Sequence, residues 1–464
     1  MILIAFLAFV ALACTISLTD WRRGWLMAIL VGVLQDPVRK LTPGMPVFLT
    51  FSIVGVYIAI LFAVHRRIQV AGREFARRFQ TIWGAFGLML LFLFMAMING
   101  VISYGIGLWK APLLSLFTYI APLPAILVGY LYLQEEEQLY RFFGFYAVVT
   151  SVALLGTPLE YYRSTLPALG MVQQVGDYIR YLPGIQVRMI SGFYRAPDIM
   201  GWHAAMLTCI SIAMIVRSGL GRRSWPWMLG AGWGFYNCMI SGRRKAIYFV
   251  AVFVLAFLWR YFRRLKPAQL AAFGAAGLVI AVVIHNISAD RNSSAYAAAA
   301  ATTRAEVTER LEGGLMETIR QFGIMGAGLG KATQGVQHIV SSEEGRGWQE
   351  GGLGKLAVEV GVPGLLAAAL LAGAAIRVMM KISSIPDLAQ TSQLGRVALF
   401  GIAMANIANF LASAQSYSDP VLTILTCFFV GCLFATVSLD ERAAAAAAAA
   451  AAQARAPQLS PVTA

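Results

Sequence analysis

The sequence predicts an all-α, polytopic membrane protein, a helical bundle with about 12–13 transmembrane helices. Hydrophobic residues make up 59% of its 464 residues and charged residues only 13%, whereas soluble domains carry roughly 25%. The mean hydropathy is +0.69. The apolar residues also gather in runs of membrane length, because a helix rising ~1.5 Å per residue needs about 20 residues to cross a ~30 Å hydrocarbon core.

The apolar runs are each expected to form one span. The second, sixth and eighth are short and are expected to be tilted, broken or re-entrant. In chain order the runs cover residues 2–18, 24–38, 46–64, 80–99, 112–133, 140–156, 199–216, 225–240, 246–260, 268–286, 354–376, 396–412 and 420–438.

The orientation of the bundle follows from its cations. With Met1 outside, most Lys and Arg of the short connections lie on the inner side, as the positive-inside rule requires. Residues 1–440 then form the bundle, and the low-complexity tail 441–464 lies in the cytoplasm. The net charge of +15 is attributed to cations in these short loops, which orient the helices and contact anionic lipid headgroups. It does not indicate nucleic-acid binding.

Two large loops lie on the outer face in this topology, at residues 157–198 and 287–353. The second contains a predicted amphipathic helix at about 303–321, whose apolar residues recur every four positions. Loops held by a rigid scaffold commonly carry function. We therefore expect the chemistry on the outer face.

The turn Arg243-Arg244-Lys245 joins two of the spans on that face. The positive-inside rule disfavours such a cluster in a short outer connection. Three cations at this point indicate a bound anion, and the prediction is a lipid-linked pyrophosphate.

Tyrosines and arginines alternate in the first loop, where Arg180, Arg188, Tyr194 and Arg195 are candidate substrate-binding residues. Guanidinium groups grip phosphate oxygens in bidentate fashion, and tyrosines stack on sugar rings. An aromatic girdle with snorkelling arginines is the alternative. The aromatic-girdle interpretation is favoured for Arg180. A binding role is favoured for Arg188 and Arg195, which lie next to Gly192 and Pro197.

Two carboxylates enter the span after the second loop. Glu350, at its outer end, is the candidate catalytic base or acceptor-orienting group, with an ion pair to Lys355 or Arg346 as the alternative. Glu359, two turns deeper, is expected to make a structural ion pair or an interhelical hydrogen bond.

Several other polar features are given structural roles. The stretch 36–40 is expected to stop a helix with a local ion pair, His203 to be a core histidine, and 326–331 to form a tight turn and not a nucleotide loop. The five cysteines show neither a disulfide frame nor ligand spacing. No metal site and no cofactor are predicted.

The order of three motifs on one face resembles the bacterial O-antigen ligase and O-antigen/exopolysaccharide polymerase superfamily. They are Arg188 to Gly201, Ser241 to Ala246, and Gly326 to Gly364. The resemblance implies a GT-C-like architecture in the inner membrane and glycan transfer from undecaprenyl pyrophosphate to an acceptor sugar, without metal and with inversion. Outer arginines hold the pyrophosphate in that family, which implies this role for Arg188, Arg195, Arg243 and Arg244.

One departure from the family pattern favours the polymerase branch. The ligase branch has a histidine about three residues before a leucine at the start of the span after the large loop. Here Glu350 precedes Leu353. Membrane lipids, the lipid-linked oligosaccharide and the acceptor glycan are then the expected partners, with chain-length regulator or export proteins as further candidates.

Three alternatives to a polymerase remain open from the sequence. The first is an O-antigen ligase that transfers glycan to lipid A core. The second is a flippase or transporter, which would be expected to show inverted repeats that are not evident here. The third is a scaffold within a synthase complex.

Overall fold

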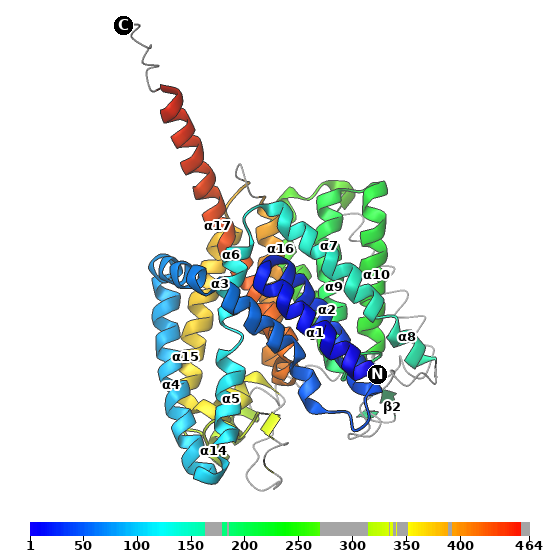
Figure 1. Cartoon of the computed structure of the whole chain (residues 1–464), viewed down its shortest axis with the longest axis vertical. Coiled ribbons are helices and arrows are strands. Elements are labelled where there is room, and N and C mark those ends of the chain that lie inside the picture. The colour runs from blue at the N-terminus through cyan, green and yellow to red at the C-terminus, as the bar shows by residue number, and fades with distance from the viewer. Residues whose placement is uncertain are drawn as a thin grey trace.

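The computed structural model describes residues 1–162, 179–182, 185–269, 314–333, 335–336, 340, 351–387 and 392–455. These residues form a bundle of α-helices with one small β-hairpin (Figure 1). The helices in chain order are α1 (Ile2–Thr19), α2 (Trp21–Leu41), α3 (Ser52–Arg78), α4 (Gln80–Tyr104), α5 (Lys110–Ile120), α6 (Pro124–Tyr132), α7 (Glu136–Ala153), α8 (Gly156–Tyr161), α9 (Pro197–Ser218), α10 (Trp225–Ile240), α11 (Arg244–Tyr261), α14 (Gly314–Phe322), α15 (Gly352–Ser383), α16 (Gln393–Ala412) and α17 (Pro420–Arg455). Short 3₁₀ turns join several of them, among them Ala414–Ser418 before α17.

The all-α membrane class is confirmed for this part of the chain. Ten of its helical segments are long and apolar enough to cross a membrane. They are Ile2–Thr19, Val47–Arg78, Gln80–Tyr104, Lys110–Tyr132, Glu136–Tyr161, Pro197–Ser218, Arg244–Arg264, Gly352–Ser383, Gln393–Ala412 and Pro420–Leu439.

The three remaining predicted spans differ for separate reasons. α2 forms a helix of 21 residues, but charged side chains near both of its ends leave it without an apolar stretch of membrane length. α10 has only 16 residues. The predicted span 268–286 lies almost wholly outside the described residues. Residues 303–313 of the predicted amphipathic helix lie outside them too, and the end of that helix is observed as α14.

The first loop contains a hairpin that the sequence does not predict. β1 (Ile179–Leu182) pairs antiparallel with β2 (Ile185–Arg188), with Ile179 opposite Arg188 and Leu182 opposite Ile185. The hairpin leads directly into the buried segment before α9.

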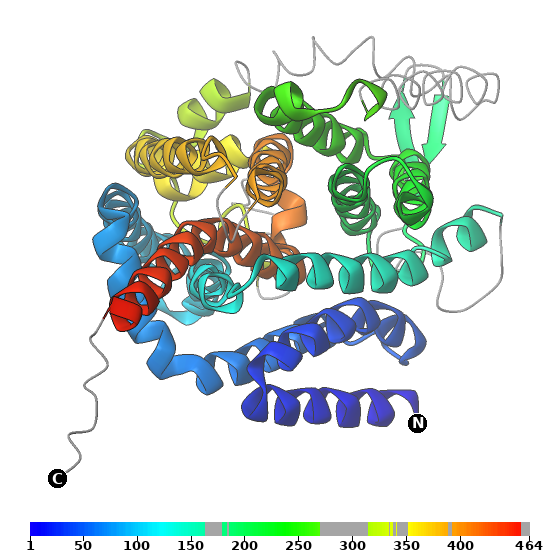
Figure 2. The same ribbon diagram turned by 90° about the horizontal axis from the view of Figure 1, so that it is seen from above.

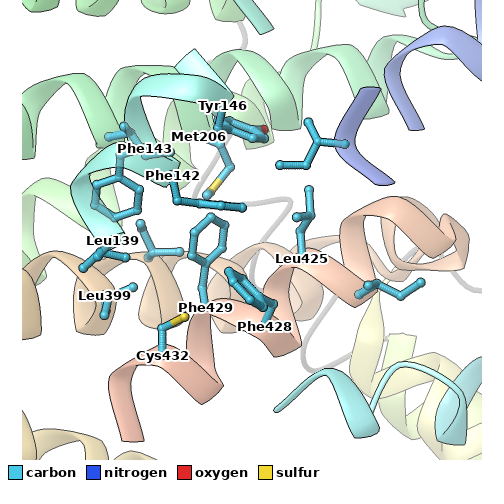
Figure 3. Close-up of a cluster of buried hydrophobic side chains, with 14 of the residues drawn as sticks. Leu139, Phe142, Phe143, Tyr146, Met206, Leu399, Leu425, Phe428, Phe429 and Cys432 are labelled. Atoms are coloured by element: carbon cyan, nitrogen blue, oxygen red, sulfur yellow. The ribbon is translucent and has the colours of Figure 1, made fainter. Parts of the chain in front are cut away.

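α9 lies at the centre of the helices that carry the site, and nearly all of its length is buried. α1 and α2 lie side by side along one side of the bundle, with α2 between α1 and α7 (Figure 2). Aromatic rings from α7 and α17 fill the space between α7 and α17 (Figure 3). Phe142 packs on Phe428 and Phe429 with ring centroids 5.0 and 5.7 Å apart, an arrangement that favours a single packing of the two helices.

Glycines allow a close helix crossing between α6 and α17. A Cβ atom at Gly129 would collide with the Phe428 carbonyl, and one at Gly431 with the Ile126 carbonyl. Lipid tails are as apolar as the side chains, so van der Waals packing of this kind is a main source of helix association in a membrane.

A glycine-rich segment lies between α4 and α15. α15 is broken at Gly361, whose φ of 67° is not helical. The backbone groups exposed by the break bond to the segment: Ala327 N donates to Val358 O (2.7 Å) and Val362 N to Ile324 O (2.8 Å). On the other side, Leu329 N donates to Ala96 O of α4 (2.9 Å). The segment is therefore a backbone bridge between two spans.

Replacing Gly328 by alanine is expected to destabilise this bridge by at least about 2 kcal/mol. Its φ of 91° is unfavourable for any side chain, and a Cβ atom would collide with the backbone of Gly100. Thermal unfolding in detergent would measure the loss. The matched control is Gly87→Ala in α4, where a Cβ atom meets nothing within 4 Å and alanine favours the helix. Equal stability of the two variants would contradict the prediction.

Candidate functional site

The polar candidate residues whose side chains the structure describes gather at one end of the bundle. This end contains the last turn of α2, the first turns of α9, α11 and α17, and the last turn of α16. Figure 1 shows β2 and α14 at the same, lower end, while the C-terminal end of α17 lies at the top. The residues come from positions far apart in the chain, and the fold brings them together.

Asp198 connects two of the three clustered cations. Its carboxylate lies 3.0 Å from Arg243 Nη2, and its other oxygen pairs with Lys245 Nζ. Lys245 also donates to Ser413 Oγ at 2.6 Å. Arg244 is 9% exposed at the first residue of α11. The start of α11 is thereby fixed to the start of α9 and to the end of α16.

The turn before α11 holds these cations in place. Ser241 Oγ donates to Cys238 O (2.6 Å) and accepts from Arg243 N (3.1 Å). Gly242 has a φ of 71°, and a Cβ atom there would lie 2.7 Å from Met189 Cγ. Met189 directly follows β2, so the end of the first loop lies against the turn. The backbone at Arg188 is accordingly close to the cation cluster.

Arg195 lies between two buried carboxylates. Its Nη1 is 3.3 Å from Asp36 Oδ1, its Nη2 is 2.5 Å from Asp419 Oδ2, and its backbone N donates to Asp36 Oδ2 at 3.0 Å. Burial lowers the pKa of Arg195, but Asp419 and Asp36 outweigh it and the pKa is raised. Burial raises the pKa of Asp419. Arg195 lowers it and Asp36 raises it, and the net shift is upward. The three side chains form one ionic cluster.

Two further charges hold the backbone that carries Arg195. Glu160 accepts from Gly192 N (2.6 Å) and Ser191 N (3.1 Å). Lys40 Nζ donates to the carbonyls of Gly192 (2.7 Å) and Tyr194 (2.5 Å). Burial lowers the pKa of Lys40 to about 8, and Asp36 and Glu160 oppose the shift. The segment between β2 and α9 is therefore fixed from both sides.

The stretch 36–40 differs from its prediction. α2 does not stop at Pro37 but continues to Leu41. Asp36 and Lys40 bond to the first loop, and Arg39 donates to Met45 O (3.1 Å) just beyond the helix. The sequence did contain a signal for these acids, because an aspartate stands directly before a proline in both places. Asp36-Pro37 lies near the end of α2, and Asp419-Pro420 lies at the start of α17. Such buried carboxylates require a cationic partner, and Arg195 supplies it for both.

Tyr194 lies among packing residues. It is 2% exposed, and its ring stacks on His203 at 4.8 Å. His203 in turn contacts Tyr146 Oη at 2.8 Å, which confirms it as a core histidine. The side chains of Arg180 and Arg188 and the whole of Glu350 lie outside the part of the chain that the structure describes. Their roles stay predictions.

Glu359 is a further buried acid near this end of the bundle. One of its oxygens accepts from Tyr119 Oη of α5 (2.6 Å), the other from Thr333 Oγ1 (2.7 Å) and Gly330 N (3.1 Å). Ser115 Oγ of α5 also donates to it at 3.2 Å. The predicted interhelical hydrogen bond is confirmed, and it also fixes the end of the glycine-rich segment.

Replacing Glu359 by glutamine is expected to destabilise the fold by about 1–3 kcal/mol, because an amide group in place of one acceptor oxygen leaves donors unsatisfied. Thermal unfolding in detergent would measure it. Glu317→Gln is the control, since that side chain is 72% exposed and its pair with Arg320 spans 3.9 Å on the surface of α14. A Glu359→Gln variant as stable as the control would contradict this assignment.

The fold and the site thus define a polytopic helical membrane protein with a group of cations fixed at one end of its bundle. The positive end of the α11 dipole adds to the charge of Arg243, Arg244 and Lys245, an arrangement suited to an anion. A scan against protein-family models finds no match for this chain, and a search of curated proteins finds none either.

Proposed function

We propose that the protein is a glycosyltransferase of bacterial polysaccharide assembly, of the polymerase type. It transfers a glycan from a polyprenyl pyrophosphate donor to an acceptor sugar at the periplasmic face of the inner membrane. The observation that carries the proposal is the joint position of Arg243 and Lys245 at the start of α11. Both contact Asp198 of α9, and the end of the first loop lies beside them.

The protein has to stabilise charge on the leaving group but does not have to supply a nucleophile, because the acceptor hydroxyl is the nucleophile. When the glycosyl C–O bond to the pyrophosphate breaks, negative charge develops on the departing oxygen. Fixed cations around that oxygen stabilise the transition state without having to reorganise. Arg243, Arg244, Lys245 and Arg188 supply them in this proposal, and Arg195 with Asp36 and Asp419 positions the loop.

The acceptor hydroxyl attacks the anomeric carbon from the opposite side, which inverts its configuration. Its proton passes to a carboxylate, and Glu350 has this role in the proposal. The polyprenyl tail stays among the spans while the glycan extends into the periplasm. The likeness of the motif order to the O-antigen polymerase superfamily supports this assignment.

The test is to incubate the purified protein in vesicles with a polyprenyl-pyrophosphate-linked oligosaccharide and to separate the products by size. A ladder of longer glycans is the expected result. A single transfer to a lipid acceptor would replace the polymerase by a ligase. No new glycosidic bond, together with movement of the donor across the bilayer, would overturn the transferase proposal in favour of a flippase.

A further inference from the structure

A second cationic site lies at the opposite end of the bundle, far from the candidate transferase site. It is an open pocket between the C-terminal end of α3 and α17, lined by Val70, Arg73, Glu74, Arg77, Arg78 and Glu441. None of these residues contributes to the ionic clusters around Arg195 and Asp198. The two sites therefore require separate explanations.

Helix lengths place this pocket at the level of lipid headgroups. α17 follows Asp419 and reaches Glu441 about 33 Å further along, at ~1.5 Å per residue, slightly more than the ~30 Å hydrocarbon core. α3 is 27 residues long, roughly 40 Å, so about two turns at its end extend beyond the core. Glu441 and Arg73–Arg78 thus lie at one membrane surface, and Asp419 at the other.

The end of α3 is amphipathic. Ala71, Phe75 and the following Phe79 are buried against the bundle. Arg66, Val70, Arg73 and Arg77 lie along the opposite face, at the three- and four-residue spacing of one helical stripe. A stripe of arginines around an exposed apolar residue is typical of a helix lying at a membrane interface.

The charges of the pocket do not all find partners within the protein. Arg78 forms an ion pair with Glu441, and Glu74 accepts a hydrogen bond from Tyr130 Oη at 2.7 Å. Arg73 and Arg77 make no ion pair or hydrogen bond with the protein in the described structure. They are one helical turn apart, so both guanidinium groups can reach a single phosphate.

We propose that this pocket binds the phosphodiester headgroup of an anionic phospholipid, with Arg73 and Arg77 as its ligands. The acyl chains would lie along the outer face of α3, where Val70 is 59% and Phe62 69% exposed. The bound lipid would fix the end of α3 to α17 at the membrane surface. This inference does not depend on the proposed transferase activity.

Native mass spectrometry of the delipidated protein in neutral detergent tests the site. The probe is dioleoyl phosphatidylglycerol, with dioleoyl phosphatidylcholine as the neutral comparison. We expect saturable binding of the anionic lipid. The Arg73→Gln/Arg77→Gln variant is expected to bind it about thirty-fold more weakly, because each basic residue near an anionic surface contributes roughly fivefold.

The matched control is Arg222→Gln/Arg223→Gln, which removes the same charge from exposed positions before α10, outside the pocket and away from α3. Its affinity is expected to stay within about twofold of the unaltered protein. An equal loss in both variants would mean diffuse surface attraction and would overturn the proposal. Equal binding of phosphatidylcholine would do the same, as would displacement of the anionic lipid by millimolar inorganic phosphate, which would indicate a small-anion site.

Discussion

Replacing Arg195 by alanine is expected to destabilise the protein by about 3–5 kcal/mol, the largest stability effect at the site. The substitution leaves Asp36 and Asp419, each 2% exposed, without the guanidinium group that lies 3.3 and 2.5 Å from them. A buried charge that loses its partner costs far more than the intact pair contributes. Thermal and denaturant unfolding in detergent would measure the loss.

The control for Arg195→Ala is Arg23→Ala. Arg23 is also paired with an aspartate, Asp20 at 3.2 Å, but its side chain is 80% exposed. Water solvates both of these groups when the pair is broken, so a loss below about 1 kcal/mol is expected. Comparable losses in the two variants would show that the Arg195 cluster is not effectively buried.

The destabilisation of Arg195→Ala is expected to shrink as the pH falls. Burial already raises the pKa of Asp419, and Arg195 opposes this rise more strongly than the backbone N–H groups of Val421 and Leu422 do. Without the guanidinium group the folded-state pKa rises further above the unfolded value, so protonation favours the folded state. Stability is then regained as the pH falls through the folded-state pKa of Asp419 and lost as the pH rises through it. A loss that is constant from neutral to acidic pH would contradict this account.

The spans could be predicted from the sequence because the membrane leaves few choices. A backbone inside lipid must satisfy its own hydrogen bonds, so an apolar run of sufficient length becomes a helix. α2 and α10 show where this argument weakens, since one is polar at both ends and the other is short, yet both are helices packed against their neighbours.

The partners of the charged residues could not be predicted in the same way. Asp36, Arg195 and Asp419 meet only because α2, α9 and α17 end at the same surface, and no local pattern contains that information. The same holds for the glycine-rich segment at 326–331. Its glycines suggest a turn, but its positive φ angles are required by close contact with Gly100 and Gly361, which belong to two other helices.

Replacing Arg243 by alanine is expected to lower glycan transfer by about 10²–10³-fold, the size of effect found when one fixed donor to a developing anion is removed. The fold should persist, because Asp198 keeps its ion pair with Lys245, and Lys245 keeps its hydrogen bond to Ser413. This separates Arg243 from Arg195, whose removal leaves two acids unpaired. The assay is product formation in vesicles at saturating donor, with thermal unfolding measured on the same preparation.

The control for Arg243→Ala is Arg223→Ala, an exposed cation in the 3₁₀ turn that precedes α10 at its other end. It makes the same change of charge on the same helical hairpin, about 24 Å away along α10, and should leave transfer within about twofold. Arg243→Lys should keep part of the activity, since an ammonium group supplies the charge but not the bidentate geometry of the guanidinium. Full transfer by the folded Arg243→Ala variant would remove this residue from the mechanism. An equal loss in Arg223→Ala would mean that transfer responds to overall charge and not to a cation fixed beside Asp198.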